Sequence, residues 1–171
     1  MSTLNQMPRD FRLLCESWSQ SVEKIVESET RLAYFQEVLP ALLLNKSLFS
    51  TILKQIIDGD PYPEIGKAAL FDNEILLYAD RNRLFSLRLY LWAPGEYTPV
   101  HDHSAWGLIG AISGAFELIK FTRNDDGSDE SYASLVETDR VVLKPGETGV
   151  TLSLDKGIHR TGNPTDKTVA T

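Results

Sequence analysis

After about residue 70 the chain becomes a succession of short segments in which apolar and polar residues alternate. In residues 84–92, Phe85 and Leu87 fall on one face of an extended strand, and Arg88 and Tyr90 fall on the other. Further strands are expected at 108–112, 115–121, 133–137, 140–143 and 148–154. Turns are expected at Pro94-Gly95, Ser113-Gly114, 124–127 and Pro145-Gly146. Many short strands with regular turns are typical of an antiparallel sandwich or barrel.

The first third has a different period and is predicted to be helical. Apolar residues from Phe11 to Val26 recur every three or four positions and form one stripe, which includes Cys15. A second helix is expected from Ser28 until Pro40 interrupts it, and a third around 48–57. No linker separates helices from strands, so we predict one domain over 1–171, with helices in 1–60 packed on a barrel in 70–171.

Composition narrows the class of protein. The chain has 171 residues and a formal net charge of −7, which argues against nucleic acid or an anionic membrane as the main partner. One cysteine excludes an internal disulfide, and no apolar run reaches transmembrane length. We therefore expect a cytoplasmic protein.

The three histidines of the chain all lie in the strand-rich part. His101 and His103 are one residue apart, and on a strand this spacing places both imidazoles on the same face. Neutral imidazole is a good ligand for iron, zinc, copper or nickel, and His159 is the remaining candidate for a third ligand. An isolated histidine is more often a surface or core residue, so the flanking residues decide between these interpretations.

Those flanking residues resemble the two cupin motifs. Residues 95–103, which read GEYTPVHDH, are similar to the first motif, in which a glycine and five further residues precede H-x-H, and Gly114 matches its closing glycine. His159 with Asn163 four positions later resembles the end of the second motif. The resemblance covers about 70–171 and implies a mainly β fold. That fold is a cupin barrel, a double-stranded β-helix or jelly roll, preceded by α-helices.

One departure from the cupin pattern concerns the ligand set. Many cupins carry a glutamate ligand four or five positions after the second histidine, where this chain has Gly107 and Leu108. The shell would then be three neutral histidines, which leave the metal its double positive charge and an open face for an anionic ligand such as a thiolate.

The three-histidine set and the run 101–107, HDHSAWG, resemble the cysteine dioxygenase family, especially its bacterial thiol dioxygenase branch. The stretch 92–95, WAPG, adds to this. The resemblance implies a non-haem iron(II) dioxygenase with one iron per chain. Its substrates would be dioxygen and a small thiol, either cysteine or a mercaptocarboxylic acid, and its product a sulfinic acid.

Other family features match less closely. Members place a tyrosine-x-arginine stretch upstream to bind the substrate carboxylate, where this chain has Phe71 and Asn73, with 78–81 as a rival placement. Arg88, on the same face as Tyr90, is a substitute candidate, although a structural role at the barrel rim is the alternative. No cysteine–tyrosine cross-link is expected, because Leu108 takes the cysteine position. The catalytic serine-x-histidine-x-tyrosine triad is expected beyond Thr171, in a chain longer than this one.

Two other function classes stay open at this point. One is a metal-dependent cupin lyase, isomerase or ring-cleaving dioxygenase that acts on a non-thiol carboxylate. The other is a ligand-sensing or storage cupin without catalysis. Three histidines also do not define the metal, since nickel, zinc or manganese suits the same ligands.

Overall fold

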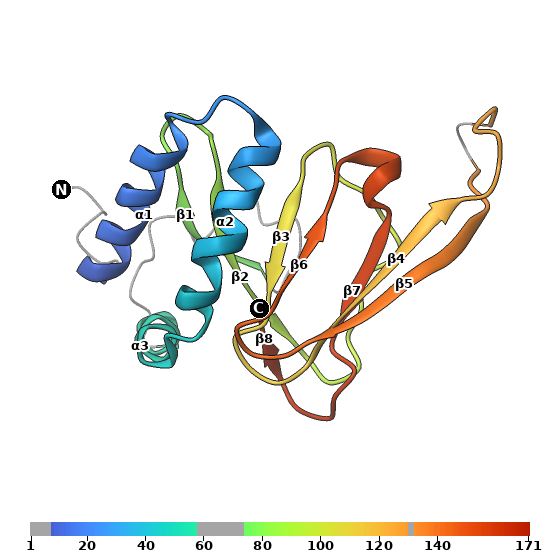
Figure 1. Cartoon of the computed structure of the whole chain (residues 1–171). Coiled ribbons are helices and arrows are strands. Elements are labelled where there is room, and N and C mark those ends of the chain that lie inside the picture. The colour runs from blue at the N-terminus through green and yellow to red at the C-terminus, as the bar shows by residue number, and fades with distance from the viewer. Residues whose placement is uncertain (1–7, 58–73, 130–131) are drawn as a thin grey trace. The chain divides into compact units, whose positions relative to one another are not determined.

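The computed structural model describes residues 8–57, 74–129 and 132–171. Three helices precede the strands in these residues: α1 (Arg9–Val22), α2 (Ser28–Leu43) and α3 (Lys46–Ile57). The strands are β1 (Glu74–Ala79), β2 (Ser86–Trp92), β3 (Gly107–Gly110), β4 (Phe116–Arg123), β5 (Leu135–Leu143), β6 (Thr148–Thr151), β7 (His159–Gly162) and β8 (Val169–Ala170) (Figure 1). A short 3-10 helix, η2 (Leu154–Gly157), precedes β7.

The described residues form two compact units. Unit 1 comprises the chain up to Glu37 together with Leu44–Leu91, and unit 2 comprises Val38–Leu43 together with Trp92–Thr171. None of the helices in the described ranges is both long enough and apolar enough to cross a bilayer.

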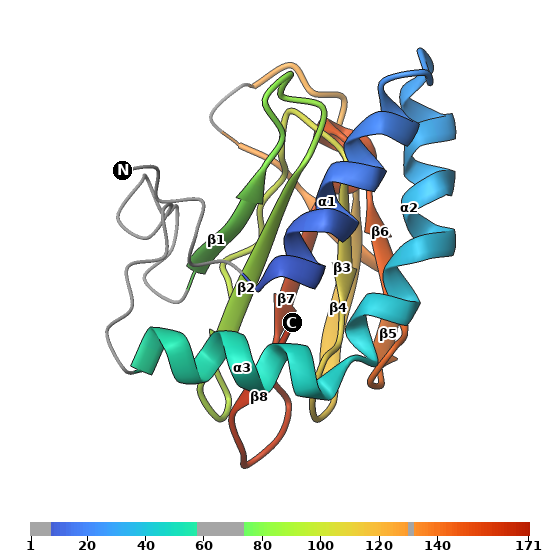
Figure 2. The same ribbon diagram turned by 90° about the vertical axis from the view of Figure 1, so that its left-hand side faces the viewer.

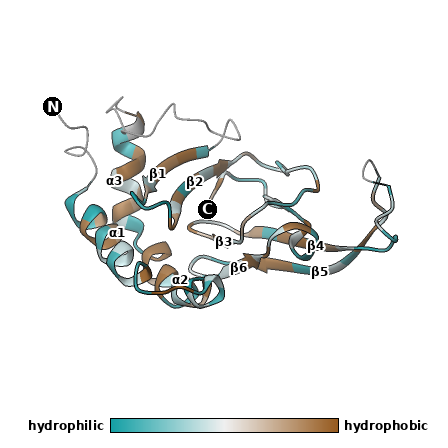
Figure 3. Ribbon diagram, turned by 90° about the horizontal axis from the view of Figure 1, so that it is seen from above, coloured by the Kyte–Doolittle hydropathy of each residue, from teal (hydrophilic) through white to brown (hydrophobic). Residues whose placement is uncertain are grey.

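Helix α1 follows the predicted apolar stripe as far as Val22, where the helix ends, and Val26, which was predicted to belong to the stripe, is exposed. Phe11, Cys15, Trp18 and Val22 of α1 are buried, and their spacing of four, three and four residues places them on one side of the helix. Figure 3, which is coloured by hydropathy, shows both hydrophilic and hydrophobic residues along this helix. Trp18 packs edge-on against Phe35 of α2, with ring centroids 5.8 Å apart. The prediction that Cys15 is a core residue of this stripe is confirmed.

Helix α2 corrects one prediction. Pro40 lies inside α2, which continues for three more residues to Leu43. A proline removes one backbone donor and costs a helix about 3 kcal/mol. Leu39, Leu42 and Leu43 around it are all buried. Burying three leucine side chains outweighs that cost, at about 1.5–3 kcal/mol each.

The strands of unit 1 form an antiparallel pair that the sequence pattern showed only in part. β1, which was not predicted, pairs with β2 in a register that sets Glu74 opposite Tyr90 and Leu76 opposite Arg88. A bulge interrupts the register between Leu76 and Tyr78. Figure 2 shows the two strands running side by side.

Unit 2 is built from nested antiparallel pairs. The innermost pair is β4 with β5, the next is β3 with β6, and the outermost joins residues 97–101 to 159–162. Such nesting is one long hairpin, and β4 also pairs with β7, which closes the hairpin upon itself. A long antiparallel hairpin wound in this way is a jelly roll. The predicted mainly β cupin fold, preceded by α-helices, is therefore confirmed.

Turn chemistry supports this winding. The expected turn glycines Gly95, Gly114, Gly127 and Gly146 all have φ between +70° and +88°, a region that suits glycine. One strand prediction was wrong, because the two segments 133–137 and 140–143 form the single strand β5. A bulge in β5, opposite the step that follows Lys120 of β4, accommodates one extra residue between these segments, and the pairing continues beyond it.

Candidate metal centre

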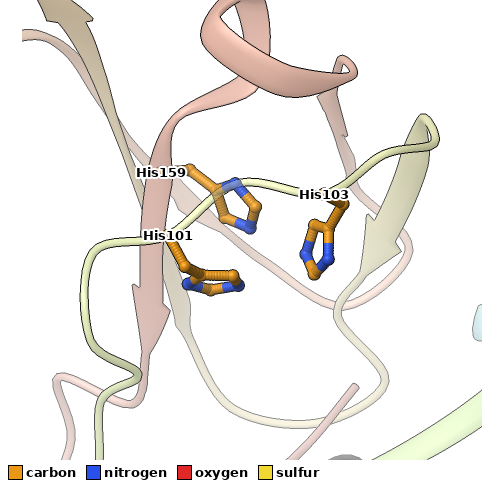
Figure 4. A group of neighbouring side chains, drawn as sticks. All are labelled: His101, His103 and His159. Carbon is orange, nitrogen blue, oxygen red and sulfur yellow. The ribbon is translucent and has the colours of Figure 1, made fainter. Parts of the chain in front are cut away.

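Three histidines from two parts of unit 2 come together. One ring nitrogen of each of His101, His103 and His159 lies within 4.8 Å of the others. The ring centroids are 4.4 Å apart for His101 and His159, 4.8 Å for His101 and His103, and 5.2 Å for His103 and His159. The rings face a common point in Figure 4. The predicted ligand set is thus gathered in space, and these residues could hold a metal ion.

Backbone pairing determines the relative position of two of these histidines. His101 and His159 are directly opposite each other, and each N–H donates to the carbonyl oxygen of the other at 2.9 Å. Opposed residues of an antiparallel pair point their side chains to the same face. The bridge therefore brings residues 58 positions apart in the sequence into contact distance.

His103 reaches the cluster differently from the prediction. It lies outside the described strands, so strand alternation does not orient its ring. Its carbonyl oxygen instead accepts a hydrogen bond of 2.7 Å from the N–H of Leu154. Leu154 has φ +52°, an uncommon backbone conformation for a branched residue, at the first position of η2. The segment that contains Leu154 and His159 therefore supplies one histidine and also fixes the backbone of His103.

Hydrogen bonds define the tautomer of two rings. Nδ1 of His101 lies 2.9 Å from the carbonyl oxygen of Pro99, and Nδ1 of His159 lies 2.6 Å from that of Gly157. A carbonyl oxygen only accepts, so in the neutral rings Nδ1 carries the proton and Nε2 carries the lone pair. This is the arrangement in which a backbone carbonyl orients a metal-ligating imidazole. The donor set fits a divalent transition metal.

The electrostatics also favour neutral imidazoles. Burial lowers the pKa of His159 to about 4, and the neighbouring His101 and His103 lower it too. Burial is also the main cause that lowers the pKa of His103. His159 is almost fully buried, whereas His101 and His103 are half-buried. At neutral pH these two rings with lowered pKa are uncharged, as ligation of a cation requires.

No carboxylate completes the cluster in the part of the chain that the structure describes. At the position expected for a glutamate ligand, a Cβ added to Gly107 would lie 2.8 Å from Oγ1 of Thr151. A side chain at 107 would therefore displace Thr151, which is paired with Gly107 across β3 and β6. Among the described residues the candidate ligand set is three histidines, as the sequence indicated.

The far face of the same sheet ties the two histidine-bearing segments together. Arg160, which follows His159, donates from Nε to the carbonyl oxygen of Thr98, and its guanidinium lies 4.6 Å from the ring centroid of Tyr97. The hydroxyl of Tyr97 donates to the buried carboxylate of Glu117 at 2.8 Å. Arg140 forms an ion pair with Glu117 at 3.0 Å. Arg160 is exposed, whereas His159 before it is buried, so the two side chains lie on opposite faces of β7.

Asn163, the last residue of the second motif, has a structural role. Its side chain is fully buried, and Nδ2 donates to the carbonyl oxygens of Trp92, Ala93 and Lys167. Its backbone N–H donates to the carbonyl oxygen of Glu96. The amide thus joins three chain segments at the start of the first motif.

The predicted substrate residues lie in unit 1. Arg88 forms an ion pair with the carboxylate of Glu74, and the hydroxyl of Tyr90 donates to the same carboxylate at 3.0 Å. The positive charge of Arg88 is therefore matched by a buried negative charge, and its role in binding substrate stays a prediction. Phe71 and Asn73 lie outside the described residues. In the rival placement, the hydroxyl of Tyr78 lies 2.9 Å from that of Ser19 and Arg81 is exposed.

Sequence reasoning overlooked Lys120. The segment 115–121 was predicted as a strand, and its alternation places Lys120 on the same face as Phe116 and Leu118, which are both buried. A cation at the end of an apolar face was the available signal. In the structure Lys120 is directly opposite His159 in the pairing of β4 with β7.

Comparisons with known proteins add the following. No family model matches the chain. A Cupin 2 conserved barrel domain protein from Salinispora arenicola is similar at 22% identity over 58% of this chain and 72% of that chain, with a TM-score of 0.40. The Cupin_2 domain of an XRE family transcriptional regulator from Enterobacter cloacae is similar at 18% identity over 57% of this chain and 86% of that chain, with a TM-score of 0.38. An oxalate oxidase is similar at 19% identity over 65% of this chain and 61% of that chain, with a TM-score of 0.36. These TM-scores lie below 0.5, so the jelly roll of unit 2 is assigned from its own strand pairing.

Proposed function

We propose that this protein is an iron(II)-dependent thiol dioxygenase that converts a small thiol and dioxygen to a sulfinic acid, with one iron per chain. One observation carries the proposal: three histidines converge without a carboxylate among the described residues. The resemblance of 101–107 to the thiol dioxygenase branch points the same way.

The charge of the cluster favours an anionic ligand. Three neutral imidazoles leave a divalent ion its full charge, whereas a glutamate ligand would cancel half of it. A thiolate is a soft anion that binds such a centre well. Iron(II), when bound, would supply the site at which a thiolate and dioxygen meet.

The protein's own residues would orient the ligands and limit access. The carbonyl oxygens of Pro99 and Gly157 hold the rings of His101 and His159 in one tautomer. His159 is buried, and His101 and His103 are each half-exposed. A small substrate would therefore enter from the side of His101 and His103.

The reaction is balanced without a further reductant. A thiol RSH and one O2 give RSO2H, so both oxygen atoms end on sulfur and the sulfur supplies the four electrons that reduce dioxygen.

Oxygen consumption tests the proposal. The anaerobically iron(II)-loaded protein would be mixed with oxygen and, in turn, cysteine, cysteamine, 3-mercaptopropionate and mercaptosuccinate. Uptake with one thiol, matched by sulfinate and abolished by a chelator, is expected. The His159→Ala variant serves as the control without a complete ligand set. If one iron binds per chain and no thiol causes uptake, the protein acts on a non-thiol carboxylate or senses a ligand.

A further inference from the structure

Four residues form a row across the sheet of unit 2. His101 is opposite His159, His159 is opposite Lys120, and Lys120 is opposite Asp139. We call these four residues the histidine row. Directly opposed residues in antiparallel strands share a face, and their Cβ atoms lie about 4.5–5.5 Å apart. Lys120 is therefore the immediate neighbour of a candidate metal ligand, on the same face of the sheet.

The burial of neighbouring residues identifies this face as the inner one. In β7, His159 and Thr161 on this face are buried, whereas Arg160 on the other face is exposed. In β5, Leu143 on this face is buried, whereas Val142 is exposed. Lys120 itself is half-buried. A lysine in such a place lays its aliphatic part along apolar neighbours and carries its ammonium toward the polar end of the face. On this face the polar neighbour of Lys120 in the adjacent strand β7 is His159.

Lys120 differs from two arginines of the same sheet. Arg123 and Arg140 each form an ion pair with a carboxylate. Among the described residues, Lys120 forms none, although Asp139 is its cross-strand neighbour. The bulge of β5 begins at this pair, and the hydroxyl of Thr138 donates to the carbonyl oxygen of Lys120 at 3.3 Å. Bulges redirect side chains and are frequent beside active sites.

We propose that Lys120 binds the carboxylate of a small mercaptocarboxylic acid whose sulfur lies at the three-histidine centre. This inference rests on the proposed function and assigns its substrate class. Lys120 of β4 and His159 of β7 lie on neighbouring strands in direct register. A metal held by the histidines and the ammonium group of Lys120 would together suit a short ligand with a thiolate at one end and a carboxylate at the other. A neutral or cationic thiol, such as 2-mercaptoethanol or cysteamine, would gain nothing from Lys120.

Direct binding to the cobalt(II)-loaded protein tests the inference without turnover. Calorimetric titrations would use 3-mercaptopropionate, 2-mercaptoethanol and propionate. The variants would be Lys120→Met, Lys120→Arg and, as a matched control, Lys144→Met, whose lysine is exposed in the turn after β5. Metal content and thermal midpoint would be measured for each variant, so that an intact centre is established first.

The expected result is a selective loss. Lys120→Met should weaken the binding of 3-mercaptopropionate by about tenfold to hundredfold and leave the affinity for 2-mercaptoethanol within about twofold of the parent value. Lys120→Arg should restore most of the affinity, and Lys144→Met should behave as the parent protein. If Lys120→Met leaves 3-mercaptopropionate unchanged, or weakens both thiols equally, the inference is overturned.

The same titrations separate this inference from the proposed function. If 3-mercaptopropionate binds no more tightly than propionate, 2-mercaptoethanol does not bind, and Lys120→Met weakens both carboxylates, the thiol reaction is wrong and the carboxylate site stands. If neither thiols nor propionate bind the parent protein, Lys120 is not a carboxylate-binding residue. If oxygen uptake with 3-mercaptopropionate occurs with the same KM in Lys120→Met, the reaction stands and the role of Lys120 is refuted.

Discussion

Unit 1 and unit 2 each contain a cluster of polar side chains, and the two clusters differ in what they leave unsatisfied. In unit 1 the buried carboxylate of Glu74 meets the guanidinium of Arg88 and the hydroxyl of Tyr90. Opposite charges and a hydrogen bond complete that cluster from within the chain. In unit 2 three histidines direct one ring nitrogen each toward a common point.

The comparison shows how composition separates a structural cluster from a binding site. A carboxylate with a guanidinium is neutral in sum and contains both donors and acceptors. Three imidazoles gathered at one point can offer ring nitrogens to a cation. Only the second arrangement gains strongly from a metal ion, which is why function is expected in unit 2.

The largest effect is expected when one member of the histidine cluster is removed. His159→Ala should abolish stoichiometric metal binding, with an affinity loss above about 100-fold, because even changing a residue that only supports a metal ligand costs 10–100-fold. Elemental analysis after loading and dialysis would measure it, and His101→Ala should behave alike. Glu74→Gln should retain the metal. A His159→Ala protein that keeps one metal per chain would show that the site is misassigned.

The next largest effect is expected when the polar cluster of unit 1 loses its carboxylate. Glu74→Gln leaves the charge of Arg88 without its partner, and we expect the free energy of unfolding to fall by about 2–3 kcal/mol. The side chain of Arg88 is 32% exposed, which places the loss below that of a fully buried pair. Urea denaturation would measure it, with the exposed Glu27→Gln as control. Equal stability of the two variants would show that the Glu74 pair is not stabilising.

The pH dependence of the unfolding free energy of the metal-free protein should reveal the contribution of the histidine cluster. Folding lowers the pKa of His159 from 6.5 to about 4, so below pH 6.5 the unfolded chain takes up a proton that the folded protein does not. The contribution is fully present above pH 6.5 and is lost as the pH falls toward 4, by about 3 kcal/mol. Urea denaturation between pH 7 and pH 4 would measure it. His159→Gln should have a flatter profile, and identical slopes would contradict the assigned cause.

The smallest effect concerns the network behind the histidines. Tyr97→Phe removes one hydrogen bond to Glu117, which keeps its ion pair with Arg140. We expect a loss of about 1 kcal/mol in unfolding free energy with unchanged metal stoichiometry. Tyr132→Phe, at an exposed tyrosine, is the control and should be neutral. A loss of metal from Tyr97→Phe would instead make this network essential to the centre.

Local patterns predicted much of the fold. Helix periodicity located the buried stripe from Phe11 to Val22, and turn residues located Gly114 and Gly146. Predictions were wrong where tertiary packing outweighs a local signal. Pro40 does not end α2, because its leucine neighbours are buried, and β5 is continuous, because a bulge absorbs its polar middle.

The candidate site was predictable as a set of residues, and not as an arrangement. His101, His103 and His159 could be selected because the chain has no other histidine and two motifs surround them. Cytoplasmic location, iron as the metal, and thiol and dioxygen as substrates stay predictions. The partner of Arg88 could not be predicted, because Glu74 reaches it through a strand pairing that alternation alone does not specify.

The sequence by itself determined the ligand types, the absence of a glutamate at Gly107 and Leu108, and the change from helices to strands. The tertiary structure alone decided which residues meet. The bridge between His101 and His159 joins the ends of the long hairpin, His103 is held by Leu154 rather than by a strand, and Lys120 becomes the neighbour of His159. The physical reason is that side-chain chemistry is local, whereas strand register depends on how distant segments bury their apolar faces together.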